Sequence, residues 1–380
     1  MNIDASAAHN AHGFPQLLRL LIVAIATALA LAGCASSTSK PNTTQRAATH
    51  PGTSTTASTA APTPAPAHAQ SILPGNLLIA DEDNNRVIEV NEAHKIVWYF
   101  PHPGDLAPGQ TFKLPDDVFF SPDGTEIVAT QEENSVISVI NVAHRRIVFR
   151  YGQTGTPGNG PNQLSNPDDA LMTRGGIIVV ADIKNCRLLA ISRRTHHIIK
   201  QLGKTGTCTH APPTLLASPN GVFPTSDGGS LITEINGDWV DIMNSHNELV
   251  RAIHPPGFTY PSDTNEVQPG RFISVDYVKP GAIEIFDRRG KLIWRYAPTG
   301  KQVLNQPSLA EALPNGDVIA NDDKNHRVII VDPHTNRIVW QYGHTGRAGS
   351  GANFLDTPDG LDLAPPHSLM MRYPGATLLR

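Results

Sequence analysis

Cysteine is scarce in this sequence, neither sign of charge predominates, and a helical period is missing from most of its length. Its 380 residues contain three cysteines. A formal net charge of −4 gives no electrostatic reason to expect nucleic acid as a partner. Residues 75–366 show no persuasive helical periodicity, which argues against a helical bundle. Glycine and proline are plentiful instead, with 31 and 32 residues, as in turn-rich β proteins.

The N-terminus has the features of an export signal. Arg19 precedes the apolar run LLIVAIATALALAG at 20–33, which is too short for a membrane span and ends in small residues. The last residues of the run and the following cysteine, LAGC at 31–34, resemble the lipobox of bacterial lipoproteins. This resemblance implies a signal peptide at 1–33 and acylation of Cys34, which would anchor the protein to a membrane. An ordinary secretory signal with a chance cysteine is the alternative.

Three further segments follow from composition. Residues 34–72 consist mainly of Ser, Thr, Ala and Pro and cannot bury enough apolar surface to fold, so we expect a tether. Residues 73–366 form the folded domain, and residues 367–380 form a tail to which no role is assigned. If Cys34 is lipidated, the domain lies in the cell envelope outside the cytoplasm, either in a periplasm or at the cell surface.

The folded domain is built from repeats. Each unit opens with a proline-led stretch such as LPDDV at 114–118, and continues with short β-branched runs between Gly, Asn, Asp and Pro clusters. The opening prolines are 42 to 52 residues apart and stand at positions 115, 167, 219, 261, 307 and 358. Four antiparallel strands in a unit of this length predict the blade of a β-propeller.

The two ends of the domain predict how the ring closes. Residues 73–100 match a blade that lacks its innermost strand, and residues 357–366 match an innermost strand with no blade after it. Joined, they complete one unit, which gives an all-β, six-bladed propeller without exposed sheet edges.

Several stretches resemble known repeat families. ADIKNCRL at 181–188 and DDKNHRV at 322–328 resemble the Asp-x-x-Asn-x-Arg stretch of NHL repeats. VDPHTNRIVWQYG at 331–343 is similar to the last two strands of PQQ-like, or quinoprotein-like, repeats. The resemblance covers about 75–366 and implies the fold far more than any activity. TEINGDWV at 233–240 and VDYVKPGA at 275–282 depart from the Asn-x-Arg pattern.

The fourth strands carry an aromatic stripe, and the turns before them carry histidines. Trp98, Trp294 and Trp340 share one strand face with other large rings. The stripe recurs in four blades, which favours packing between blades over a sugar-stacking platform. The histidines, one or two to a turn, are expected to be exposed and too far apart to share a metal ion; they are His94, His144, His196, His197, His246 and His334.

A set of acidic and amide residues opens the inner strands and faces the axis of the ring. Several oxygen ligands around one axis suit Ca²⁺ or another divalent cation, as in six-bladed lactonases that resemble this fold. The alternative is that Pro-Asp pairs only order the turn into each strand. The candidates are Asp117, Asp169, Asn220, Asp263 and Asp359, with Asp116 and Asp168 beside the first two.

Long connections between blades, at 101–113, 153–165, 204–216 and 344–356, share a face with the turns between second and third strands. This loop-rich face is the expected binding surface. Cys186 and Cys208 both belong to it, so a disulfide is geometrically reasonable, and by the chain-entropy estimate it would contribute about 3 kcal/mol.

Function is less constrained than fold. Neither a Ser-His-Asp nor a Cys-His motif is visible, so we expect an extracytoplasmic binding module, monomeric, that holds a protein, glycan or small molecule through the loop-rich face. The alternative is a metal-dependent hydrolase or lyase of lactonase type. A quinone-dependent enzyme is less well supported, because such enzymes usually have eight blades and this sequence predicts six.

Overall fold

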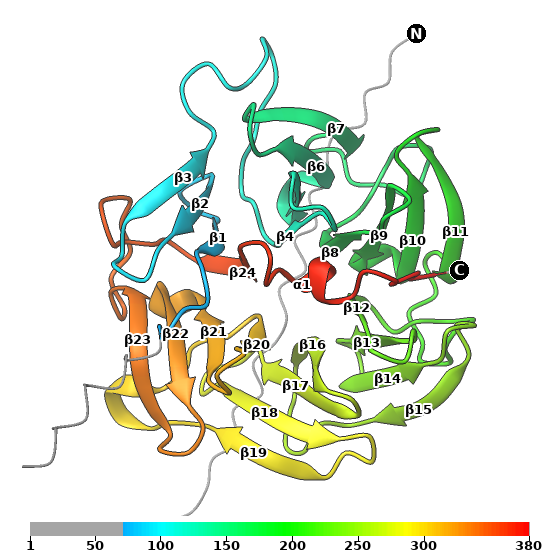
Figure 1. Ribbon diagram of the computed structural model, residues 1–380. Helices are drawn as coiled ribbons and strands as arrows, with labels where there is room; N and C mark the ends of the chain where they lie inside the picture. The colour runs from blue at the N-terminus through cyan, green and yellow to red at the C-terminus, as the bar shows by residue number, and fades with distance from the viewer. Residues whose placement is uncertain (1–70, 380) are drawn as a thin grey trace, which may run out of the picture. The chain divides into compact units, whose positions relative to one another are not determined.

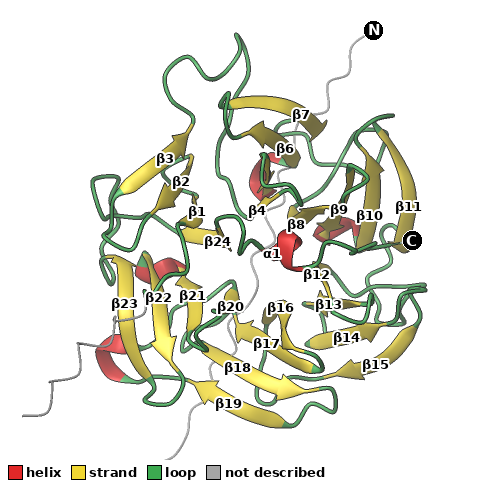
Figure 2. Cartoon of the chain, in the orientation of Figure 1, coloured by secondary structure: helices red, strands yellow, loops and turns green. Residues whose placement is uncertain are grey.

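The computed structural model describes residues 71–379, which form a ring of six four-stranded antiparallel sheets (Figure 1). The predicted signal peptide, Cys34 and nearly all of the predicted tether lie outside the described residues. No helix among the described residues is long and apolar enough to cross a membrane. The described chain is almost entirely strand and loop (Figure 2).

Within each blade the first strand lies at the axis of the ring and the fourth at its rim. Blade 1 contains β24 (Pro358–Leu363), β1 (Leu77–Asp81), β2 (Arg86–Val90) and β3 (Ile96–Phe100). Blade 2 contains β4 (Val118–Phe120), β5 (Glu126–Gln131), β6 (Val136–Asn141) and β7 (Arg146–Gly152). Blade 3 contains β8 (Pro167–Met172), β9 (Ile177–Asp182), β10 (Arg187–Ser192) and β11 (His197–Gly203).

The remaining blades follow the same order. Blade 4 contains β12 (Pro219–Pro224), β13 (Ser230–Glu234), β14 (Trp239–Met243) and β15 (Leu249–Ile253). Blade 5 contains β16 (Pro261–Gln268), β17 (Arg271–Asp276), β18 (Ala282–Asp287) and β19 (Leu292–Tyr296). Blade 6 contains β20 (Ala310–Ala312), β21 (Val318–Asp322), β22 (Arg327–Asp332) and β23 (Arg337–Gly343).

The ring closes through its two ends, which confirms the prediction from the sequence. β24 pairs antiparallel with β1, with Leu77 opposite Leu363 and Ile79 opposite Leu361. These side chains are buried, so the closing strand joins the core as well as the sheet. The predicted count of six blades is also confirmed.

The tryptophans of the fourth strands join neighbouring blades. Trp98 Nε1 donates to the carbonyl oxygen of Val142 in blade 2 at 3.1 Å, and Trp340 Nε1 donates to that of Glu92 in blade 1 at 3.0 Å. The His94 ring lies edge-on to Trp340 with centroids 5.2 Å apart, so it packs between blades and is not the exposed turn residue that we expected. The stripe is packing, in agreement with the interpretation of the sequence.

The Asp-x-x-Asn-x-Arg stretch forms a buried polar cluster where the second strand turns into the third. In blade 6, Asp322 Oδ2 accepts from Arg327 Nε at 2.7 Å and from Asn325 Nδ2 at 2.9 Å. Asp322 Oδ1 accepts from the backbone N–H of Asn305, in the connection that enters the blade. The Asp therefore ties that connection to its own blade, and blades 1 and 3 repeat the arrangement with Asp81 and Asp182.

Cys186 and Cys208 form a disulfide with Cα atoms 5.1 Å apart, as predicted. It joins the start of the third strand of blade 3 to the connection that leads into blade 4. In the same blade, the N–H of Gly206 donates to the carbonyl oxygen of Asn185 at 3.0 Å. The long connections thus lie on the same face as the turns between second and third strands.

The C-terminal tail covers the centre of the ring on the opposite face. Its short helix α1 (Leu369–Arg372) lies at the middle of the ring in Figure 1. Leu369 and Leu379 are buried in the core cluster that also contains Phe119 and Phe223 of the inner strands. Arg372 pairs with the fully buried Glu311 of β20. One mouth of the central channel is therefore covered by the protein's own chain.

Candidate functional site at the channel mouth

A left-handed residue before the proline turns the chain into each inner strand in five of the six blades. Asn166, for example, has φ of 52° and precedes Pro167. The pairing between β8 and β9 then shifts register between Pro167 and Ala170, so the two aspartates at 168 and 169 stand at an irregular start of the strand. The left-handed residues are Leu114, Asn166, Ser218, Gln306 and Thr357.

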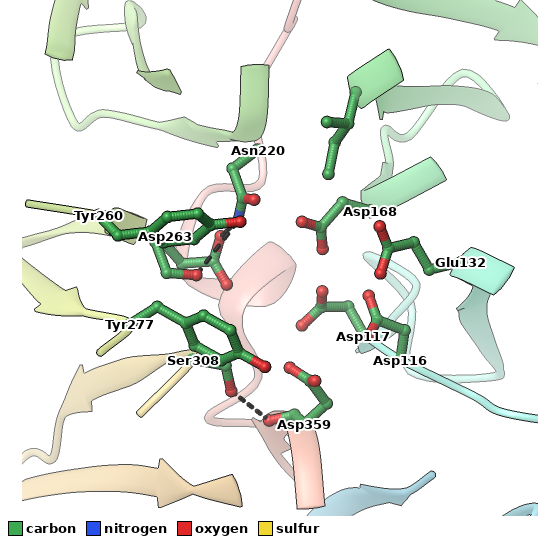
Figure 3. Close-up of a pocket in the computed structure, with 12 residues that line it drawn as sticks. Asp116, Asp117, Glu132, Asp168, Asn220, Tyr260, Asp263, Tyr277, Ser308 and Asp359 are labelled. Carbon is green, nitrogen blue, oxygen red and sulfur yellow. Dashed lines mark hydrogen bonds between the residues drawn. The ribbon is translucent and has the colours of Figure 1, made fainter. Parts of the chain in front are cut away.

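This local geometry brings side chains from different blades together on the axis (Figure 3). Ligand oxygens of Asp117, Asp169 and Asp263 all lie within 4.8 Å of one another. A second group of the same size, Asp116, Asp117 and Asp168, shares Asp117 with the first. Each group draws on more than one blade, so the packing of blades around the axis assembles it.

The carboxylates surround a cavity of about 70 Å³, which has room for an ion with a few water molecules. Glu132 and Ile183, from turns between second and third strands, line it as well, which places the cavity on the loop-rich face. Two half-buried tyrosines, Tyr260 and Tyr277, belong to the same wall.

Several of these oxygens have no hydrogen-bond donor. Asp169 is fully buried, and no donor of the described chain reaches either of its carboxylate oxygens. Asp117 Oδ1 is likewise buried and without a partner. Buried acceptors of this kind are costly unless an ion, a water molecule or a proton satisfies them. Asn220 donates through Nδ2 to Ser262 Oγ at 3.1 Å, which leaves its carbonyl oxygen as a further ligand.

Two glycines make room for the carboxylates. A Cβ at position 221 would lie 2.1 Å from Asp169 Oδ2 and 2.8 Å from Asp263 Oδ1. A Cβ at position 360 would lie 2.6 Å from Asp117 Oδ1. Neither glycine has a left-handed φ. The carboxylates therefore exclude a side chain at position 221, whereas at position 360 the backbone of Asp117, with its Cα 2.5 Å away, excludes one together with the carboxylate.

Burial and mutual repulsion disfavour the charged forms of the whole group. Burial, followed by the charges of neighbouring aspartates, raises the pKa of Asp117 and Asp169 well above the usual range. Burial also raises the pKa of Asp263 to about 7 and that of Glu132 to about 7. Without a cation the group therefore retains protons near neutral pH, and a bound cation would displace them.

These pKa shifts predict that the cation-free protein loses stability as pH rises. The unfolded carboxyls titrate near pH 4 and the folded ones near pH 7, so between these values the folded state binds more protons and its free energy of unfolding falls. With a chelator present, we expect a higher melting temperature at pH 5 than at pH 8. Added Ca²⁺ should raise the melting temperature more at pH 8 than at pH 5, and equal shifts at both pH values would contradict this explanation.

The structure brings the predicted residues together. Asp117, Asn220, Asp263 and Asp359 line the cavity, and Asp169 reaches it through its group with Asp117. The sequence interpretation missed Glu132, Tyr260 and Tyr277. Tyr260 directly precedes Pro261, so proximity to the repeat proline could have indicated it. Glu132 lies in the turn between β5 and β6, away from the repeat prolines, and only the folded structure shows that this turn reaches the axis.

Fold and site together define a six-bladed β-propeller with an acidic central pocket. No family model matches the sequence, and no curated protein matches it. A protein of unknown function from Bacteroides caccae superposes with a TM-score of 0.53 at 14% identity, over 76% of this chain and 98% of its own. The WD40 propeller domain of Doa1 gives 0.48 at 12% identity, over 76% and 92%. Virginiamycin B lyase from Staphylococcus aureus gives 0.44 at 15%, over 63% and 75%. Likeness at this level concerns the fold alone.

Proposed function

We propose that the protein is a cation-dependent binding module, which holds a divalent cation on the propeller axis and a ligand above it on the loop-rich face. The observation that supports this most directly is the set of buried, unpartnered carboxylate oxygens on Asp117 and Asp169 beside the central cavity. A cation would compensate the charge and the missing hydrogen bonds at once.

The donor set favours Ca²⁺ over a transition metal. Carboxylate and amide oxygens surround the cavity, and neither a histidine nor a cysteine is among its lining residues. Because Ca²⁺ takes six to eight oxygen ligands, a ligand with carboxylate or hydroxyl oxygens can complete the coordination from the open mouth. This suits a glycan, an acidic small molecule or an acidic protein loop.

Calorimetry of the purified protein with Ca²⁺ tests the proposal. After treatment with a chelator, we expect saturable binding of about one ion at pH 7.5, accompanied by release of protons from the raised carboxyls. Proton release appears as a binding heat that depends on the ionisation enthalpy of the buffer. Absence of saturable binding of Ca²⁺, Mg²⁺ or Mn²⁺ would overturn the proposal.

One observation favours a second candidate, a metal-dependent hydrolase or lyase. Glu132 lines the same cavity but belongs to neither carboxylate group, and burial raises its pKa to about 7, the range of a general base. A panel of esters and lactones tests this alternative. It requires activity that the Glu132→Gln variant loses while it retains the cation.

The same proposal places the module outside the cytoplasm as a monomer, held to a membrane through acylated Cys34. The sequence LAGC at 31–34 and the Ser, Thr, Ala and Pro-rich segment after it support this placement. A Cys34→Ser variant should be released from the membrane fraction, and its retention there would argue against the anchor.

A further inference from the structure

Blade 4 departs from the buried ion pair of blades 1, 3 and 6. In blade 3, Asp182 ends the second strand and lies opposite Arg187, which opens the third, and the two pair at 2.7 Å. In blade 4 the same register places Glu234 opposite Trp239. An aromatic ring has thus replaced the arginine, and the buried carboxylate at this position has lost its cation.

A second carboxylate and a histidine occupy the space beside Glu234. Asp241, two residues after Trp239 in β14, is fully buried, as is Glu234. His210 Nδ1 lies 3.2 Å from Glu234 Oε2 and 3.8 Å from Asp241 Oδ2. One ligand atom from each of the three residues lies within 4.8 Å of the others.

The protein satisfies the carboxylates of this cluster only in part: Glu234 Oε2 accepts from the backbone N–H of Ala217 at 2.6 Å. No donor among the described residues reaches either oxygen of Asp241, and Glu234 Oε1 is also without a partner. Within residues 71–379, the ion pairs of both carboxylates are with His210 alone. Burial and the adjacent charge of Glu234 raise the pKa of Asp241 to about 9. Blades 1, 3 and 6 place a guanidinium at this position, whereas blade 4 leaves two carboxylates facing an imidazole.

The loop that carries His210 is held in place. The disulfide fixes Cys208 to blade 3, and the backbone of Ala211 pairs with Leu215 across the loop. The His210 ring stacks on Trp239 with centroids 4.1 Å apart and planes 10° apart. The side chain of His210 is 20% exposed, whereas those of Glu234 and Asp241 are fully buried, so the histidine is the member of the cluster that solvent reaches.

We propose that His210, Glu234 and Asp241 form a second metal site, for a transition-metal ion of the zinc class, separate from the carboxylate site on the axis. One imidazole nitrogen and two carboxylates are a ligand set typical of zinc, and water can take the remaining position. The ion supplies the positive charge that arginine supplies in blades 1, 3 and 6. The disulfide and the Trp239 stack hold the histidine toward the carboxylates.

Calorimetry with Zn²⁺ on the full-length protein, in excess Ca²⁺ to occupy the axial site, tests this proposal. We expect the His210→Ala and Asp241→Asn variants each to bind Zn²⁺ about a hundredfold more weakly than the unchanged protein. Co²⁺ provides a local readout, because this paramagnetic ion should quench the fluorescence of Trp239. The Trp239→Phe variant should bind Zn²⁺ but lose that quenching.

His254→Ala is the matched control. His254 also packs against Trp239, with centroids 3.6 Å apart and planes tilted by 38°, but is not part of the cluster, so its loss should leave Zn²⁺ affinity unchanged. Asp117→Asn, which alters the axial site, should leave it unchanged as well. Circular dichroism without metal establishes that each variant is folded. If folded His210→Ala and Asp241→Asn bind Zn²⁺ like the unchanged protein, a proton shared by the carboxylates satisfies the cluster and the proposal is wrong.

Discussion

Calcium binding by the Asp117→Asn variant is expected to be about a hundredfold weaker than that of the unchanged protein, or undetectable. Asp117 belongs to both carboxylate groups on the axis, so its replacement reduces the charge and the ligand count of each. The change is nearly isosteric, and its effect on the fold should be small. Since the variant removes one of several repelling carboxylates, we expect the cation-free protein to become more stable at pH 8. Calorimetry and thermal melting measure the two effects.

Asp123→Asn is the control for this prediction. Asp123 lies in the same blade on an exposed turn, and its Oδ1 accepts from Ser121 Oγ and from the backbone N–H of Thr125. An asparagine oxygen can retain both hydrogen bonds, so affinity for Ca²⁺ should not change. If Asp117→Asn and Asp123→Asn bind Ca²⁺ equally well, the axial carboxylates are not the ligands.

Replacing Arg327 by alanine is expected to lower the free energy of unfolding by about 3–5 kcal/mol. Arg327 is fully buried and pairs with Asp322, which is also fully buried. Its Nη1 donates to Gln302 Oε1 at 2.8 Å and to Thr345 Oγ1 at 3.0 Å, so it joins the connections on both sides of blade 6. The variant leaves an uncompensated buried carboxylate and a cavity. Urea denaturation followed by fluorescence measures the loss.

The exposed Arg337 of the same blade provides the comparison. Its replacement by alanine should change the free energy of unfolding by less than about 0.5 kcal/mol. A loss below about 1 kcal/mol for Arg327→Ala would mean that the Asp-x-x-Asn-x-Arg cluster contributes little to stability, and that the repeat retains it for another reason.

The fold was predictable because each blade repeats its own local signals. Turn residues recur at regular positions, and the incomplete segments at 73–100 and 357–366 complement each other, so blade number and closure followed from the sequence. The tail was not predictable in the same way. Leu369 and Leu379 have no repeat partner, and only the finished ring creates the apolar centre that they cover.

The candidate site was predictable where residues share a repeat position and hidden where they do not. Asp117, Asp169 and Asp263 follow the repeat prolines, which identified them. His210 lies in a connection without regular spacing, and Glu234 stands at a position that is normally structural. The sequence shows that TEINGDWV departs from the repeat pattern, but only the folded structure offers a reason for the departure. Trp239 stands where blades 1, 3 and 6 have an arginine, and a reason for this difference emerges only when the structure places Asp241 and His210 beside Glu234.

The pairing of β24 with β1 also dictates the order of assembly during biosynthesis. β24 follows all the strands of blades 2 to 6 in the sequence, so β1 keeps an unpaired edge until those blades have been synthesised. The axial pocket shares this delay, because Asp359 lies on β24. A chain truncated before residue 358 would thus lose both its circular closure and its complete pocket. It would also expose the unpaired edge of β1, to which strands of other molecules can bind.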